Sequence, residues 1–147
     1  MKALIQRVTH SAVDIEGKTA GETGNGLLIF LGVMKGDTEK DLAYLLKKIP
    51  QLRIFEDERN KLNLSVTDIS GEILVISQFT LSADCRKGNR PSFESAEEPG
   101  KAQEMYLRFI DGLQATGLRI SSGKFGAHMR VHLTNDGPVT IMLDSKA

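Results

Sequence analysis

The sequence predicts a single α/β domain over residues 1–147, with two main helices packed on a mostly antiparallel or mixed, barrel-like sheet. Apolar residues recur with the period of a helix in two segments, and strand-like segments precede, separate and follow them. The chain has 147 residues, the length of one domain. Its 40% hydrophobic and 26% charged residues are typical of globular proteins and exclude collagen-like and disordered classes.

The N-terminal third of this arrangement is predicted to be strands. Residues 2–15 mix β-branched and polar residues, and Glu16-Gly17-Lys18 and Asn25-Gly26 are turn signals. The run from Leu27 to Val33 is apolar apart from one glycine, so we expect a central strand that is covered on both faces.

Both helices are marked by their ends and by one apolar face. The start of the first helix is marked by Thr38 and Asp41, which resemble a capping box, and Pro50 ends it. The second begins near Pro99 and ends at Gly117. The apolar faces consist of Leu42, Leu45, Leu46 and Ile49 in the first helix and of Ala102, Met105, Tyr106, Phe109, Ile110 and Leu113 in the second.

The remaining segments predict further strands. Residues 52–55 resemble a short strand, residues 56–63 an exposed loop and residues 72–79 a strand with a buried centre. On both sides of residues 135–138, apolar and polar residues alternate. This pattern predicts a C-terminal hairpin with its turn at Asn135-Asp136-Gly137-Pro138.

Charge and cysteine content exclude several classes of protein. The chain has 19 Lys and Arg and 19 Asp and Glu, so it is not a uniformly basic nucleic-acid-coating protein, although a local basic patch is possible. Its one cysteine, Cys85, cannot form an internal disulfide, and no Cys/His cluster has zinc spacing. We expect no metal and no cofactor.

Nothing in the sequence indicates export or membrane insertion. The N-terminal residues lack the apolar segment of a signal peptide. The longest apolar run, Leu27 to Met34, is too short to cross a membrane. We therefore expect a cytoplasmic protein.

Conventional nucleophiles have little support. Ser77, either His128 or His132, and Asp136 could form a triad, but their spacing does not favour one and no Gly-x-Ser-x-Gly motif is present. Cys85 stands beside two cations, as some reactive cysteines do. A lone cysteine on a polar loop is more often incidental.

The segment Ser77-Gln78-Phe79-Thr80-Leu81 ends an apolar strand with three uncharged hydrogen-bonding side chains. Ligands meet α/β sheets at strand ends. Main-chain N–H groups and hydroxyls there would stabilise a developing oxyanion. Taken alone, the segment is more simply interpreted as a strand end.

Two further segments are candidate binding elements. A cis bond, found in about 5–6% of X–Pro bonds, would let Gly137-Pro138 aim successive carbonyl oxygens at an ammonium group, although a plain turn is the simpler interpretation. Arg86, Lys87 and Arg90 lie on a Gly- and Pro-containing loop that would bind phosphates modestly and in a salt-sensitive way. The alternative for this loop is a solvated surface.

Together, Ser77-Gln78-Phe79-Thr80-Leu81 and Asn135-Asp136-Gly137-Pro138-Val139-Thr140 resemble the two signature motifs of the D-aminoacyl-tRNA deacylases, the D-tyrosyl-tRNA deacylase family. The segments Ile5-Gln6-Arg7-Val8, Arg86-Lys87-Gly88-Asn89-Arg90-Pro91-Ser92-Phe93 and Phe125-Gly126-Ala127-His128-Met129 resemble that family as well. The resemblance runs from the first predicted strand to the last.

This resemblance implies an RNA-binding hydrolase of translation quality control. It would cleave the ester between a D-amino acid and the 3′ end of tRNA, and would also remove glycine from mischarged tRNA. It would act without a metal, as a homodimer with its active site at the subunit interface. The 2′-hydroxyl of the terminal ribose, rather than Thr80, would carry the chemistry.

The resemblance also assigns roles to residues. The catalytic site falls to Ser77, Gln78, Phe79 and Thr80, the binding of the aminoacyl group to Gly137, Pro138, Arg7 and Met129, and the binding of tRNA to Arg86, Lys87 and Arg90. The Gly137-Pro138 peptide, held by Arg7, would reach into the partner's pocket. There, rigid carbonyls would fix the ammonium, so that an L side chain strikes the backbone while a D side chain points to solvent.

Two other functions remain open. One is a non-catalytic module that binds an RNA end or DNA through the same pocket and basic loop. The other is an editing domain borrowed by a synthetase, against which the absence of a recognisable linker argues.

Overall fold

The computed structural model describes residues 1–147, which form eight strands and two α-helices. The helices are α1 (Glu39–Lys48) and α2 (Pro99–Gln114), and two 3₁₀ turns are η1 (Ile49–Gln51) and η2 (Phe79–Ser82). The strands are β1 (Lys2–Ile15), β2 (Lys18–Thr23), β3 (Gly26–Gly32), β4 (Phe55–Glu56), β5 (Leu62–Leu64), β6 (Glu72–Ser77), β7 (Arg119–Ser122) and β8 (Arg130–Asp144).

The main sheet is organised around β1. Along one edge, β1 pairs antiparallel with β8 from Lys2–Asp144 to Asp14–Arg130. Its other edge pairs first with β3 and then with β2, both antiparallel. Strands β3, β6 and β7 continue the sheet in parallel. The Ser121 hydroxyl on β7 donates a 3.3 Å hydrogen bond to the carbonyl of Glu22 on β2, so the mixed sheet curls until it is nearly closed.

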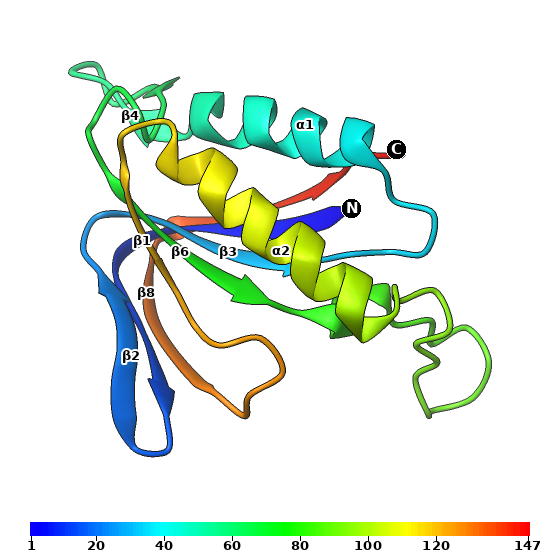
Figure 1. Cartoon of the computed structure of the whole chain (residues 1–147). Coiled ribbons are helices and arrows are strands. Elements are labelled where there is room, and N and C mark those ends of the chain that lie inside the picture. The colour runs from blue at the N-terminus through cyan, green and yellow to red at the C-terminus, as the bar shows by residue number, and fades with distance from the viewer.

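Both helices cover the same face of the sheet (Figure 1). Their apolar faces and the strands beneath them enclose the main core, in which Leu45, Phe109, Ile5 and Ile29 are fully buried. Strand β3 is buried on both faces except at half-buried Phe30, much as its continuous apolar run predicts. Neither helix has both the length and the apolar character that a membrane-spanning helix needs.

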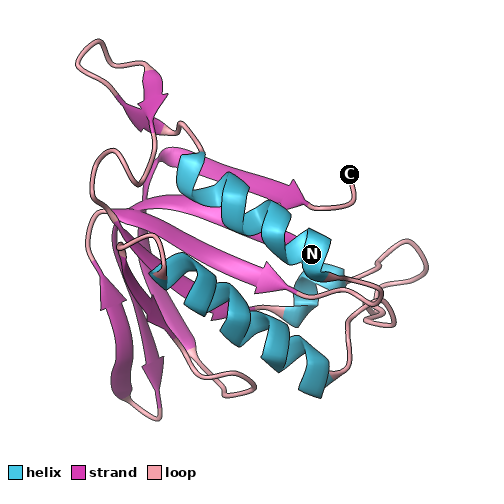
Figure 2. Cartoon of the chain, turned by 45° about the horizontal axis from the view of Figure 1, so that its top comes forward, coloured by secondary structure: helices cyan, strands magenta, loops and turns pink.

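The opposite face of the sheet carries no helix (Figure 2). Towards the curled end it buries a smaller cluster that includes Val8, Leu28 and Ile76. Elsewhere, neighbouring residues on β3, β1 and β8 form an apolar row of Phe30, Leu4 and Met142. Leu4 and Phe30 are only half-buried and Met142 is 50% exposed, so this row is left partly open to solvent.

The two ends of the chain lie side by side beside α1 (Figure 1). The Met1 ammonium forms a 2.8 Å ion pair with buried Asp37, which also pairs with Lys146 at 3.0 Å. At the start of α1, Asp41 accepts hydrogen bonds from the Thr38 N–H at 2.8 Å and from the Ser145 hydroxyl at 2.7 Å. The predicted capping residues therefore also fasten the last residues of the chain.

Four sequence predictions are corrected here, and one strand was missed. Residues 129–143 do not form a hairpin, because β8 continues through residues 135–138 as one long strand beside β1. Residues 52–54 are irregular, and residues 55–64 contain the short β4–β5 pair within the expected loop. Strand β6 ends at Ser77 rather than at residue 79, and the strand β7 was not predicted.

Candidate active site

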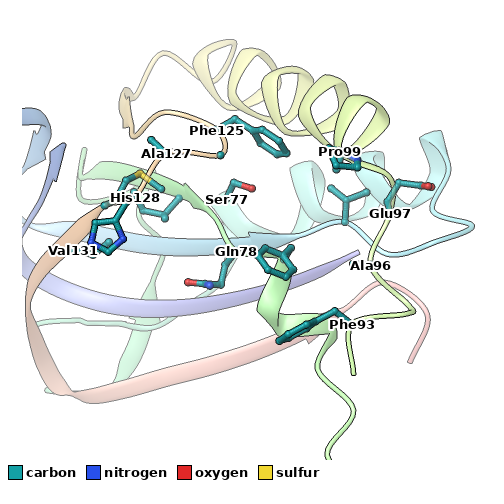
Figure 3. A pocket seen from close by; sticks show the side chains of 16 residues that line it. Ser77, Gln78, Phe93, Ala96, Glu97, Pro99, Phe125, Ala127, His128 and Val131 are labelled. Carbon is teal, nitrogen blue, oxygen red and sulfur yellow. The ribbon is translucent and has the colours of Figure 1, made fainter. Parts of the chain in front are cut away.

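A cavity of about 560 Å³ opens where β6 ends. Its wall is formed by Ser77, Gln78 and Phe79, by the start of α2, and by the loop that joins β7 to β8. Figure 3 shows side chains from these three parts around one space, with Phe125 and His128 on the β7–β8 loop and Glu97 before α2. Ten of the 16 lining residues are hydrophobic, so the cavity suits a largely apolar group.

The main chain turns sharply beside this cavity. The N–H of Gln78 continues the sheet by donating to the carbonyl of Leu31 at 2.8 Å. Phe79 and Thr80 then begin η2, so their N–H groups have no acceptor within that turn. The N–H of Phe79, a residue of the cavity wall, can bind an oxygen that gains negative charge, and the N–H of Thr80 follows it in the chain.

The hydroxyl groups at this site lack a base. The Thr80 hydroxyl accepts a 2.5 Å hydrogen bond from the Gln78 amide, and Thr80 itself does not line the cavity. No histidine or carboxylate hydrogen-bonds to the hydroxyl of Ser77 or Thr80. An activated serine or threonine nucleophile requires such a partner.

The possible triad is not formed. His132 pairs with Asp14 at 2.9 Å, and Asp136 pairs with Arg7 at 3.3 Å. Only Ser77 and His128 share the cavity, and no hydrogen bond joins them. The interpretation as a serine hydrolase triad is therefore wrong.

The basic loop begins at the cavity wall. The main chains of Asp84 and Ser92 exchange two hydrogen bonds, of 2.8 and 2.9 Å, which close the loop at its base. Immediately after it, Phe93 packs edge-on against Phe79, with ring centroids 5.1 Å apart. The loop and the cavity therefore share one wall.

The three cations of this loop are not equivalent. Asp84 binds Arg86 through two N–H groups, with the closest contact at 2.6 Å, and these bonds lower the pKa of Asp84 to about 2. Lys87 and Arg90 are exposed and form no ion pair. They are the loop cations that remain available to a ligand.

Met129 forms part of the cavity wall, as do its neighbours Ala127 and His128. It packs directly over Gly123, where a Cβ atom would lie 2.4 Å from the Met129 sulfur. Glycine at this position leaves room for the methionine, whose flexible end would have to shift if a Cβ atom were present. Gly123 thereby allows Met129 to take its present position beside the cavity.

The second motif lies in another part of the molecule. The peptide bond between Gly137 and Pro138 is cis, and both residues are exposed on β8. Beneath them Arg7 is 5% exposed, and its Nε donates to the carbonyl of Asp136 at 2.9 Å. A second bond, of 2.8 Å, joins Arg7 to the carbonyl of Ile54.

One chain does not bring the two motifs together. Gly137 lies beside Arg7, which faces Leu27 across the sheet, and Leu27 faces Ile73 on β6. Ser77 is therefore four residues further along and three strands away. At about 3.3 Å per residue and 4.8 Å per strand, the motifs are roughly 20 Å apart.

Several cavity residues were not assigned a role from the sequence, notably Phe93, Glu97 and Phe125. The Glu97 side chain is 9% exposed, and its hydrogen bond from Lys101 lowers its pKa. Phe93 and Phe125 lie in segments that resemble the deacylase family, but only the tertiary structure places them and Glu97 around one cavity. No group of three or more His, Cys, Asp or Glu side chains is gathered where it could hold a metal ion.

Comparisons with known proteins agree with the sequence resemblance. Among curated relatives, a D-aminoacyl-tRNA deacylase of Persephonella marina is 58% identical over 147 residues, covering 100% of this chain and 99% of the relative. A protein of the same name from Aquifex aeolicus is 56% identical over 146 residues, 99% of each chain.

Two solved structures share the fold. The c-Myc DNA Unwinding Element Binding Protein superposes with a TM-score of 0.94 at 45% identity and covers 100% of both chains. A probable eukaryotic D-amino acid tRNA deacylase has a TM-score of 0.85 at 17% identity over 97% of both chains, which is a similarity of fold alone. A sequence model of the D-Tyr-tRNA(Tyr) deacylases matches residues 4–144, which include both motifs. This chain belongs to the D-Tyr-tRNA(Tyr) deacylase family.

Proposed function

We propose that this chain, as one domain over residues 1–147, hydrolyses D-aminoacyl-tRNA to free D-amino acid and tRNA. The bond between the carbonyl carbon and the ribose oxygen breaks, the hydroxyl of a water molecule bonds to the carbonyl carbon, and the ribose oxygen takes the proton. The observation that carries the proposal is the cavity at the end of β6, which has Ser77, Gln78 and Phe79 in its wall. Membership of the deacylase family over nearly the whole chain supports it.

The terminal adenosine of tRNA occupies the cavity in this proposal. Its flat base suits walls that contain Phe79, Phe93 and Phe125, because bases stack on aromatic side chains. The ester carbonyl then lies at the rim, where the N–H groups of Phe79 and Thr80 stabilise the oxyanion. One such donor contributes about 2.7–4 kcal/mol to a comparable transition state.

No protein nucleophile is needed for this reaction. An aminoacyl ester is already activated, and orientation alone supplies several kcal/mol of the barrier. The hydroxyls of Ser77 and Thr80 have no base partner, which favours the ribose 2′-hydroxyl as the group that assists attack. The protein then provides position and main-chain donors.

The aminoacyl end is held by two copies of the chain. In an aminoacyl ester the amino nitrogen and the carbonyl carbon are both bonded to Cα at about 1.5 Å, so they lie within about 3 Å of each other. The roughly 20 Å between Gly137 and Ser77 in one chain is far too long for both to contact them. We therefore assign the ammonium to Gly137 and Pro138 of a second copy, held by that copy's own Arg7.

The helix-free face of the sheet is the surface proposed for this homodimer. Leu4, Phe30 and Met142 form an apolar row across three strands, and Met142 is 50% exposed. Partly exposed apolar side chains gathered on one face are typical of an interface. Pairing this face with its copy is the simplest symmetric arrangement.

Mixing two inactive variants tests the shared site. Ala127→Trp fills the cavity, and Gly137→Ala displaces the second motif because the new Cβ would lie 2.8 Å from the Val139 nitrogen. After subunit exchange, mixed dimers contain one intact composite site, so about one quarter of the wild-type activity returns. If both motifs act within one chain, mixing restores nothing.

Handedness follows from the proposed geometry. With the ammonium and the ester both fixed, the two remaining substituents of the α-carbon have set directions. A D side chain points to solvent, whereas an L side chain meets the main chain. Glycine has no side chain to exclude, so glycyl-tRNA is also cleaved.

The decisive assay compares the two isomers of one substrate. Purified protein releases tyrosine from D-tyrosyl-tRNA and leaves L-tyrosyl-tRNA intact. If both survive micromolar protein, the assignment fails. We place the reaction in the cytoplasm, where charged tRNA is used.

Duplex DNA is the control ligand for the alternative function. One solved relative is described as a DNA-binding protein, but the curated relatives named above are deacylases. The neutral net charge also gives duplex DNA little general attraction. Tight binding of duplex DNA without turnover of D-tyrosyl-tRNA would favour the binding module.

A further inference from the structure

Opposite Arg7, strand β8 leaves its regular pairing with β1. Gln6 faces Thr140 and Val8 faces Asn135, so two residue steps on β1 are matched by five on β8. We call residues 136–139 the Gly-Pro loop. Because its residues outnumber those opposite them, the ladder with β1 cannot hold all of their main-chain groups.

The side chain of Asn135 replaces part of the missing ladder. Its Oδ1 accepts a 3.0 Å hydrogen bond from the N–H of Val139, and its Nδ2 donates at 3.0 Å to the carbonyl of the same residue. One amide therefore binds both main-chain groups of Val139, as a neighbouring strand would. A longer contact of 3.4 Å joins Nδ2 to the Thr140 hydroxyl.

The two hydrogen bonds between Asn135 and Val139 join the two ends of the Gly-Pro loop. On the other side, buried Arg7 holds the carbonyl of Asp136 at 2.9 Å. The two ends of the loop are thus fixed by different side chains, while Gly137 and Pro138 lie between them, exposed. Neither Asn135 nor Arg7 needs to touch a ligand to control where this exposed pair points.

We propose that Asn135 is a positioning residue that sets the aim of the Gly137 and Pro138 carbonyls and, through it, the discrimination between D and L substrates. The inference rests on the proposed function. A shift of about 1 Å in a positioning group costs on the order of 100-fold in rate. If the carbonyls can tilt, the ammonium can tilt with them, and an L side chain then escapes the main chain that excludes it.

The test compares three variants. Asn135→Ala removes both bonds to Val139, whereas Asn135→Asp keeps an acceptor for the N–H and loses the donor to the carbonyl. Gln114→Ala removes an exposed amide at the end of α2 and is the matched control. For each variant, kcat/KM is measured with D- and L-tyrosyl-tRNA, together with the melting temperature and the hydrogen exchange of the Val139 amide.

Asn135→Ala is expected to lower kcat/KM for the D substrate by about 100-fold and the D-to-L ratio by about tenfold. Asn135→Asp gives an intermediate loss, and Gln114→Ala changes neither value. The Val139 amide exchanges faster in Asn135→Ala. A lower melting temperature with an unchanged D-to-L ratio would overturn the proposal, because a purely structural residue alters the folded fraction and not the ratio.

Failure of the proposed function gives a different result. In that case the wild-type protein leaves D-tyrosyl-tRNA intact, and no D-to-L ratio of kcat/KM can be measured for any variant. The hydrogen exchange rate of the Val139 amide is then the only measurement that tests the role of Asn135. Exchange that is unchanged in Asn135→Ala shows that the amide does not hold the loop, which also overturns the inference.

Discussion

The hydroxyl of Tyr106 on α2 donates a 3.0 Å hydrogen bond to the main-chain carbonyl of Val75, two residues before Ser77 on β6. Tyr106 is 2% exposed, and burial raises its pKa to about 12. The bond joins the helix that borders the cavity to the strand that ends at it. Stability and the position of the cavity wall are therefore linked at this residue.

Tyr106→Phe should lower the free energy of unfolding by about 1 kcal/mol at neutral pH, because the Val75 carbonyl loses a partner. The pH dependence should also change. Between pH 10 and 12 the unfolded tyrosine loses its proton while the folded one keeps it, so wild-type stability falls by up to about 1.4 kcal/mol per pH unit. Urea unfolding at pH 9 and 11 checks this. A variant whose stability declines as steeply as the wild type would contradict the assignment.

Thr80→Ala should retain activity within about tenfold of the wild type, because the Thr80 hydroxyl has no base partner and lies outside the cavity. Single-turnover hydrolysis of D-tyrosyl-tRNA measures the loss. The circular dichroism spectrum serves as the control for folding. Complete inactivity in a folded variant would indicate a threonine nucleophile instead.

Replacing both Lys87 and Arg90 by alanine should raise KM for aminoacyl-tRNA while kcat stays nearly constant, since both side chains are exposed and lack ion pairs. If each contacts one phosphate, the salt dependence of binding loses a slope of about 1.4 to 1.8. An aminoacyl-adenosine ester, which lacks the preceding phosphates, is the control substrate. Its hydrolysis should not change.

Arg86→Ala tests whether the ion pair with Asp84 withdraws a cation from the same loop. Because Asp84 already neutralises Arg86, this variant should change KM less than the double variant. Asp84→Asn should have the opposite effect: it should lower KM for aminoacyl-tRNA, because tRNA binding becomes tighter at low salt. Equal losses from Arg86→Ala and from the double variant would show that Asp84 leaves Arg86 free to bind RNA.

Asp41→Asn should destabilise the protein by roughly 2 kcal/mol at neutral pH. Burial alone would raise the pKa of Asp41, but hydrogen bonds from Ser145 and Thr38 outweigh it and lower the pKa to about 2. Wild-type stability from this residue is present above pH 4 and is lost as the pH falls towards 2, because the unfolded carboxyl takes up its proton first. Unfolding of both proteins at pH 7 and pH 2.5 should therefore show a difference that shrinks with acid.

The sequence predicted the structure correctly where local helix signals agree with the long-range packing of apolar residues. Thr38 and Asp41 mark the start of α1, and the apolar faces of both helices meet the core as their spacing requires. It misled at residues 135–138, where strong turn signals lie within alternating segments. Pairing with β1 outside this point keeps β8 in line, and the surplus residues become a bulge instead of a turn.

The candidate site was only partly accessible from the sequence. Ser77, Gln78, Phe79 and Met129 could be named from motifs, and the structure gathers them around one cavity. Glu97 could not be named, because nothing near it in the chain distinguishes it from a surface glutamate. The pairing of Arg86 with Asp84 was also missed, since exposed loops carry no periodic signal.

The pairing of β1 with β8 has a consequence for how the protein forms during synthesis. Lys2 on β1 pairs with Asp144 on β8, so the first strand leaves the ribosome long before the last strand has been synthesised. Until then, one edge of a strand in which half of the residues are apolar stays unpaired, and unpaired strand edges are recognised by chaperones and promote aggregation. Folding that depends on so distant a closure is slow by nature, and the final step must await the C-terminal strand.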